Sequence, residues 1–195
     1  MRDTGRAERI LERSLSNEVI NGRPDYLKVF VSSQMRGGVL ADERLAAIEA
    51  IDSQPYHRAW AWERDAKAGT YSSERLCLGQ AASSDALVLI LGVDLTKITA
   101  KEYAAARRVG IPRFVLLQDG VIRTEVADKF VTRERKRDVV TVNFANLAEV
   151  RTQIRDGLRN HILRTQRRSI VRARSGRPCP LIRIKTRFGS RPSPK

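Results

Sequence analysis

One stretch constrains the fold more than any other: Ala86–Gly92, seven consecutive apolar or glycine residues rich in leucine, valine and isoleucine. Such a run is typical of a strand that is buried on both faces of a parallel sheet. It is too short to cross a bilayer, which requires roughly 20 apolar residues. A polar segment follows it, and a helix is predicted to begin at Thr99. Because ligands bind where the strands of an open parallel sheet end, Glu102 lies at a position suited to chemistry.

Strands and helices are predicted to alternate along the rest of the chain. The predicted strands are 27–33, 58–62, 86–91, 113–117 and 139–144. The predicted helices are 42–51, 74–82, 99–108 and 147–163, with a short helix in the charged segment 121–138. This alternation predicts an α/β three-layer sandwich around a parallel sheet of five strands, in the flavodoxin-like order 2-1-3-4-5.

Two local details follow from the same patterns. Asp42 is the predicted N-cap of the helix 42–51, with Leu45, Ile48 and Ile51 on its inner face. Trp60 and Trp62 are predicted to share one face of their strand, packed in the core or, alternatively, stacked on a base.

Positive charge is concentrated in the last part of the chain. The formal net charge is +15, and residues 161–195 hold eleven lysines and arginines with no acid, which leaves +4 for residues 1–160. We therefore expect an N-terminal helical extension (1–26), an α/β domain (27–163) and a basic tail (164–195). The prolines and glycines of the tail predict disorder. Its charge allows non-specific binding to nucleic acid.

Several classes of protein are disfavoured by what the sequence lacks. Cys77 and Cys179 form neither a disulfide framework nor a metal-ligand spacing, so we expect a reducing cytoplasm and no metal. We expect no signal peptide and no membrane span. The sequence has no Walker A motif, no GxGxxG and no Ser-His-Asp set, which disfavours the usual ATPases, dehydrogenases and hydrolases.

Four blocks occur in a characteristic order: Val29–Ser33, Asp42–Arg44 with Ala47–Ile51, Ser84–Gly92, and Thr99-x-x-Glu102-Tyr103. Over residues 27–130 these blocks resemble a bacterial family, domain of unknown function 4062. That family is similar to TIR domains and nucleoside deoxyribosyltransferases. The resemblance implies a TIR-like fold and a glutamate that acts at the C1′ carbon of an N-glycoside.

The resemblance also implies which residues would form a site. By motif position, Glu102 is the candidate catalytic residue. Ser32 and Ser33, at the end of a strand, match residues that contact a ribose or phosphate. Gly92 and Tyr103 belong to the same motifs and are further candidates for substrate binding. Independently of the resemblance, Glu63, which follows the predicted strand 58–62, is a candidate for a hydrogen bond to a ribose diol.

Glu102, the two serines and Glu63 also have structural explanations. Thr99-Ala-Lys-Glu102 is a capping box, in which the glutamate side chain would reach back to the Thr99 amide. Strand-end serines often only cap turns, and Glu63 can be a solvated surface acid. An open cleft beside Glu102 would favour catalysis, and a side chain turned onto Thr99 would favour a cap.

Two functions of different classes therefore remain. The first is a nucleotide N-glycosidase or glycosyl transferase that acts on NAD or a related nucleotide through Glu102, in bacterial signalling or defence, with the nucleotide as substrate and no other cofactor. The alternative is a non-catalytic module that assembles with itself or with an effector protein. Association with nucleic acid through the basic tail is a further alternative.

Overall fold

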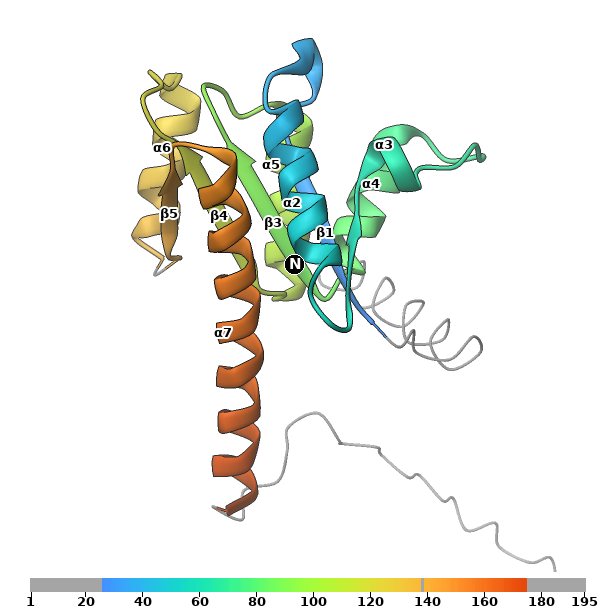
Figure 1. The fold of residues 1–195 in the computed structure, drawn as a ribbon. Coiled ribbons are helices and arrows are strands. Elements are labelled where there is room, and N and C mark those ends of the chain that lie inside the picture. The colour runs from blue at the N-terminus through green and yellow to red at the C-terminus, as the bar shows by residue number, and fades with distance from the viewer. Residues whose placement is uncertain (1–25, 138, 175–195) are drawn as a thin grey trace, which may run out of the picture. The chain divides into compact units, whose positions relative to one another are not determined.

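The computed structural model describes residues 26–137 and 139–174. Five parallel strands form one sheet in the order β2-β1-β3-β4-β5 (Figure 1). Their bounds are β1 Leu27–Ser33, β2 His57–Trp60, β3 Ala86–Leu91, β4 Arg113–Gln118 and β5 Thr141–Phe144. The predicted fold class and strand order are thus confirmed. β3 lies at the centre and all its residues are buried, because both of its faces are covered by helices.

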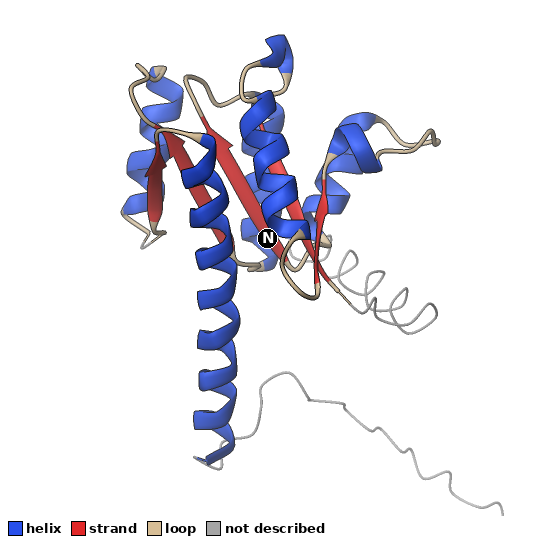
Figure 2. Ribbon diagram, in the orientation of Figure 1, coloured by secondary structure: helices blue, strands red, loops and turns tan. Residues whose placement is uncertain are grey.

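Helices cover both faces of the sheet (Figure 2). α2 and the first part of α7 lie on one face, and α4, α5 and α6 lie on the other. Two short helices, η1 and α3, lie in the connections that follow β1 and β2. The bounds are η1 Arg36–Gly38, α2 Ala41–Asp52, α3 Trp62–Asp65, α4 Ser73–Ala82, α5 Lys97–Val109, α6 Glu125–Arg135 and α7 Leu147–Arg174.

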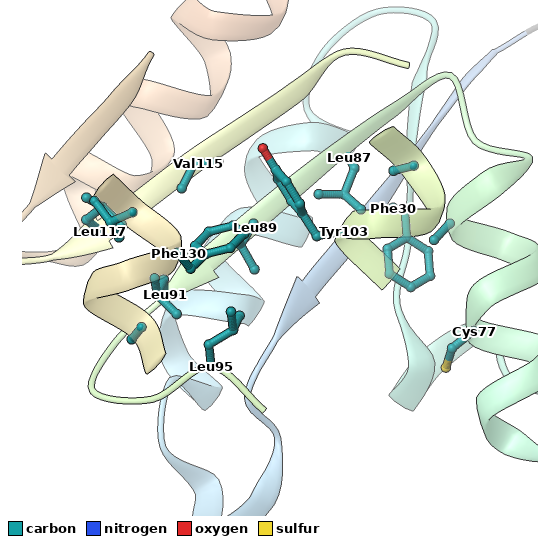
Figure 3. Packing of buried hydrophobic residues seen from close by; sticks show 14 of the residues in the cluster. Phe30, Cys77, Leu87, Leu89, Leu91, Leu95, Tyr103, Val115, Leu117 and Phe130 are labelled. Atoms are coloured by element: carbon teal, nitrogen blue, oxygen red, sulfur yellow. The ribbon is translucent and has the colours of Figure 1, made fainter. Parts of the chain in front are cut away.

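The alternation of side chains along β3 divides the core between these two helix layers. Leu87, Leu89 and Leu91 pack with residues of α4, α5 and α6 (Figure 3). Val88 and Ile90 point to the opposite face and are fully buried there as well. On that face, the backbone of Gly157 in α7 lies so close to Phe114 that an added Cβ would come within 3.1 Å of the ring. Glycine thus permits the close approach of α7 to β4.

α2 differs from its prediction at two positions. The residue before its first turn is Leu40, at a left-handed φ of 71°, and Asp42 lies within the first turn instead of capping it. Leu45 is 55% exposed, so its predicted place on the inner face is wrong. The buried stripe is Arg44, Ile48 and Ile51, the i, i+4, i+7 positions of a helix. A residue one position after Arg44 is rotated by a quarter turn or more, toward solvent.

The predicted arrangement of the two tryptophans is also wrong. β2 ends at Trp60, and Trp62 begins α3, so the two residues do not share a strand face. The Asp65 carboxylate accepts a 2.8 Å hydrogen bond from the Ala61 amide and closes this turn directly after the strand. Trp60 is buried and stacks on Phe30, with 5.1 Å between ring centroids. Trp60 is therefore a core residue.

The C-terminal helix is longer than predicted. α7 continues to Arg174, so residues 164–174 of the predicted tail are helical. The remainder of that tail and the predicted N-terminal helical extension lie outside the described residues. Within 26–137 and 139–174, no helix combines the length and the apolar character needed to cross a membrane.

Candidate functional site

Buried polar side chains gather where β1 ends. Ser32, Ser33, Arg44, Thr99 and Glu102 are all at most 7% exposed. We call these five residues, together with Glu63 and Cys77, the β1-end cluster. β1 leads into α2 on one face of the sheet, and its neighbour β3 leads into α5 on the other. The cluster therefore lies at the topological switch point, where doubly wound folds bind their ligands.

Glu102 does not cap its helix. α5 begins at Lys97, and its N-cap is Thr96, whose Oγ1 accepts a hydrogen bond from the Thr99 amide. The predicted capping box is therefore wrong, because the helix starts earlier than Thr99. Thr99 instead lies in the first turn, where its hydroxyl contacts that of Thr96 at 2.8 Å and donates to the Ser33 carbonyl at 3.4 Å. Glu102 follows in the second turn and faces the sheet.

The Glu102 carboxylate is held by side chains from two other elements. Ser32 Oγ donates to Glu102 Oε2 at 2.5 Å. Burial raises the pKa of Glu102, while hydrogen bonds from Ser32 and Cys77 and the positive charge of Arg44 oppose that rise. Burial and the negative charge of Glu102 raise the pKa of Cys77 to about 12, so Cys77 is a thiol that donates to the carboxylate. The site thus holds a buried carboxyl group with an elevated pKa.

A second set of hydrogen bonds links Ser33, Arg44 and Glu63. Ser33 Oγ accepts a 2.9 Å hydrogen bond from Arg44 Nη1. Arg44 also binds Glu63 with two parallel hydrogen bonds, Nε to Oε1 at 3.0 Å and Nη2 to Oε2 at 2.7 Å. Burial tends to raise the pKa of Glu63, but the hydrogen bonds and charge of Arg44 outweigh it and leave that pKa lowered. Glu63 is therefore an ionised partner of Arg44 at the edge of the cluster.

Comparison with known proteins identifies the family. The sequence model described as "Domain of unknown function (DUF4062)" matches residues 28–159. The chain belongs to this family. The matched segment contains the sheet, apart from its first residue Leu27, and every residue of the β1-end cluster. No curated protein matches the chain.

Two solved structures are similar to this DUF4062 domain at low sequence identity. The metal-soaked Flv1 flavodiiron core from Synechocystis sp. PCC6803 is 12% identical, with a TM-score of 0.46; the match covers 80% of this chain and 41% of that one. A flavodoxin from the domain Archaea is 11% identical, with a TM-score of 0.42; the match covers 67% of this chain and 95% of that one. The chain thus spans less than half the length of the flavodiiron core.

The DUF4062 domain brings together most, but not all, of the residues singled out from the sequence. Ser32, Ser33, Glu63 and Glu102 belong to one cluster. Gly92 lies at the same edge of the sheet, directly after β3, where an added Cβ would be 2.9 Å from Gln118 Oε1. A side chain at this position would therefore have to displace the end of the Gln118 side chain.

Tyr103 lies apart from the cluster. Its hydroxyl donates to Glu134 at 3.0 Å and accepts from Arg113 at 3.3 Å. Its ring meets Phe130 edge-on, with 4.9 Å between centroids (Figure 3). These contacts satisfy the hydroxyl between α5, β4 and α6, so Tyr103 is a buried part of the core.

Two members of the cluster were not found from the sequence. Arg44 was quoted only within a motif, although its place in an i, i+4, i+7 stripe with Ile48 and Ile51 could have indicated its burial. Cys77 was considered only for disulfides and metals. Its contact with Glu102 depends on the packing of α4 beside α5, which no local pattern shows.

Two surface cavities lie elsewhere in the described residues. One of about 690 Å³ runs along α6 and is lined mainly by basic residues, among them Arg123, Lys129 and Lys136. The other, of about 600 Å³, lies at the start of β2 and is lined by residues such as Tyr56 and Arg58. Neither cavity is lined by a residue of the β1-end cluster.

Proposed function

We propose that this DUF4062 domain cleaves the N-glycosidic bond of NAD or a related nucleotide, with Glu102 as the carboxylate that acts at the reacting carbon. One observation carries the proposal. Glu102 lies buried at the switch point of the sheet and is hydrogen-bonded to Ser32. It does not cap the free backbone amides at the start of α5, although that helix begins only five residues earlier, at Lys97. A carboxyl group with an elevated pKa at a ligand-binding edge is a candidate functional group.

The chemistry requires one carboxylate next to a cationic centre. As the base leaves C1′ with the bonding electron pair, positive charge develops on the sugar ring, and a negative oxygen stabilises it. Water then adds to C1′, and its proton goes to the released base or to solvent. Ser32, bonded to one oxygen of Glu102, would orient the other oxygen toward the sugar. Ser33 and Gly92 lie at the same sheet edge, where they would border the substrate.

The test compares the intact chain with Glu102→Gln and with a control, Glu74→Gln, whose carboxylate pairs with Lys101 on the surface. Purified protein is incubated with NAD, its phosphorylated form and common nucleosides, and released base is measured by chromatography. We expect release by the wild type and by the control, and a loss of about 10²- to 10³-fold in Glu102→Gln, as for other lost transition-state charges. Absence of release by the wild type, alone or self-assembled, contradicts the proposal.

A non-catalytic interaction module is the second candidate, and specific observations favour it. The polar side chains of the β1-end cluster bind one another, and neither surface cavity is lined by any of them. Such a network can serve only to fix the connections after β1 and β3. If the wild type releases no base but self-associates in sedimentation experiments, the module is the better account of this domain.

A further inference from the structure

We infer that Arg44 is the phosphate-binding residue of this site and that Glu63 occupies the phosphate position when no nucleotide is bound. The inference rests on the proposed function, because it names the part of the nucleotide that the site recognises. When a nucleotide binds, the Glu63 carboxylate leaves the Arg44 guanidinium, and a phosphate group of the nucleotide takes its place.

Arg44 presents the geometry that phosphate recognition requires. Its side chain is only 5% exposed, and Ser33 fixes one end of the guanidinium through Nη1. The opposite edge, Nε and Nη2, forms two parallel hydrogen bonds to the two oxygens of Glu63. Carboxylates and phosphates both accept this bidentate pair, so a group that binds one can bind the other.

Glu63 is the replaceable partner of the pair. Its side chain is 42% exposed and belongs to α3, a helix of only four residues. Both of its oxygens bind Arg44, and the carboxylate also accepts a hydrogen bond from its own backbone amide. These are the hydrogen bonds that a rotation of the Glu63 side chain into solvent breaks. Arg44 cannot rotate outward in the same way, because it is buried and held by Ser33. A buried guanidinium without an anion is strongly unfavourable, so a second anion is needed when Glu63 leaves.

A phosphate on Arg44 would lie next to the proposed reacting group. Arg44 binds Ser33 and Glu102 binds Ser32, and these serines are adjacent at the end of β1. Arg44 is also close enough to affect Glu102. Burial raises the pKa of Glu102, and the charge of Arg44 opposes part of that rise. The site would therefore distinguish phosphorylated nucleotides from nucleosides, and Glu63 would compete with the phosphate.

Inorganic phosphate tests the anion site without any assumption about turnover. The melting temperature is measured in phosphate and in chloride at equal ionic strength for the wild type, Glu63→Gln, Arg44→Lys and the control Glu49→Gln. Glu49 pairs with Arg151, away from the cluster. We expect phosphate to stabilise Glu63→Gln more than the wild type, and Arg44→Lys to lose this response. No larger phosphate response in Glu63→Gln than in Glu49→Gln overturns the inference, even if Arg44→Lys fails to fold.

A matched pair of ligands then links the anion site to the nucleotide. Binding of nicotinamide mononucleotide and of nicotinamide riboside, which differ by one phosphate, is measured by calorimetry in a Glu102→Gln background. Adding Glu63→Gln should tighten binding of the mononucleotide by about tenfold, the size of one charged hydrogen-bonding interaction, and leave the riboside unchanged. Equal effects on both ligands overturn the inference. If the wild type releases no base but Glu63→Gln still shows the larger stabilisation by phosphate, only the proposed N-glycosidase function is contradicted.

Discussion

Ser32 Oγ donates a 2.5 Å hydrogen bond to Oε2 of Glu102 and thereby joins the end of β1 to the second turn of α5, 70 residues further along the chain. Both residues are buried, at 1% and 7% exposure. A buried carboxylate is tolerated only when its oxygens are hydrogen-bonded. Ser32 is therefore a positioning residue for Glu102, and it fixes the relation between the two elements that meet at the switch point.

Replacing Ser32 tests this relation. Ser32→Ala removes a donor that lowers the pKa of Glu102, so that pKa should rise further. We expect a loss of about 1–3 kcal/mol in the free energy of unfolding, measured with urea at pH 7, because a buried acceptor is left unsatisfied. Ser53→Ala is the control, since its hydroxyl binds only the Ala50 carbonyl at the end of α2. Equal losses in the two variants would show that the Ser32–Glu102 bond has no special weight.

The fold was predictable because its signals are local and strong. The apolar run at Ala86–Leu91 is typical of a strand covered on both faces, and it forms the central strand of the sheet. Alternating strands and helices leave few topologies once crossovers are right-handed. The end predicted for this helix at residue 108 lies one residue before the observed end of α5 at Val109, where Gly110 follows at a left-handed φ of 77°.

The candidate site was predictable only in part because its contacts join distant segments. Two threonines, Thr96 and Thr99, could each be the N-cap of α5. The sequence pattern predicts Thr99, which makes Glu102 a residue of the capping box. In the structure the N-cap is Thr96, so Glu102 lies in the second turn. The helical spacing of Arg44, Ile48 and Ile51 could have indicated that Arg44 is buried. It could not have indicated the partners of Arg44, because Ser33 and Glu63 lie 11 and 19 residues away.

The central strand supplies a prediction about stability. Leu89 is fully buried in β3 and packs with α4, α5 and α6. Leu89→Ala should therefore reduce the free energy of unfolding by about 2–5 kcal/mol in urea denaturation. Leu45→Ala is the matched control, because Leu45 is 55% exposed and should cost less than about 1 kcal/mol. A loss below 1 kcal/mol for Leu89→Ala is incompatible with a central, closely packed β3.

Cys77 supplies a prediction about reactivity. Its pKa of about 12 leaves about 1,000-fold less thiolate at pH 8 than the usual value of 9.0, and its side chain is buried. In a Cys179→Ser background, a thiol reagent should therefore label Cys77 at least that much more slowly in the folded protein than in urea. The Ser32→Ala variant is an informative comparison, because loosening Glu102 should speed labelling. Rapid labelling of the folded wild type would contradict the thiol's place in the cluster.

The basic end of the chain can be divided by two truncations. Ending the chain after Arg174 removes six of the eleven lysines and arginines of residues 161–195, and ending it after Leu163 removes all of them. Because each neutralised phosphate releases counterions, the salt concentration that elutes the protein from heparin should fall in two steps. Circular dichroism should show that 1–163 keeps the α/β domain. Equal elution of the three chains would place the polyanion-binding surface elsewhere, for example at the basic cavity along α6.

The raised pKa of Glu102 has a consequence for stability that separates it from Glu63. The folded protein holds a proton on Glu102 at pH values where the unfolded chain, with a pKa near 4.5, has lost it. The contribution of Glu102 to the free energy of unfolding is therefore present below about pH 4.5 and is lost as the pH rises through the higher folded pKa.

The contribution of Glu63 changes with pH in the opposite direction. Because its pKa is lowered in the folded protein, Glu63 stabilises the fold above its usual pKa of 4.5, and this contribution is lost as the pH falls through its folded pKa. Urea denaturation from pH 2.5 to 8 should thus show the stability of Glu102→Gln rising relative to wild type above about pH 4.5, and that of Glu63→Gln falling relative to wild type as the pH rises to about 4.5. A parallel pH dependence in the two variants would mean that Glu102 is neither desolvated nor distinct from an ordinary paired acid.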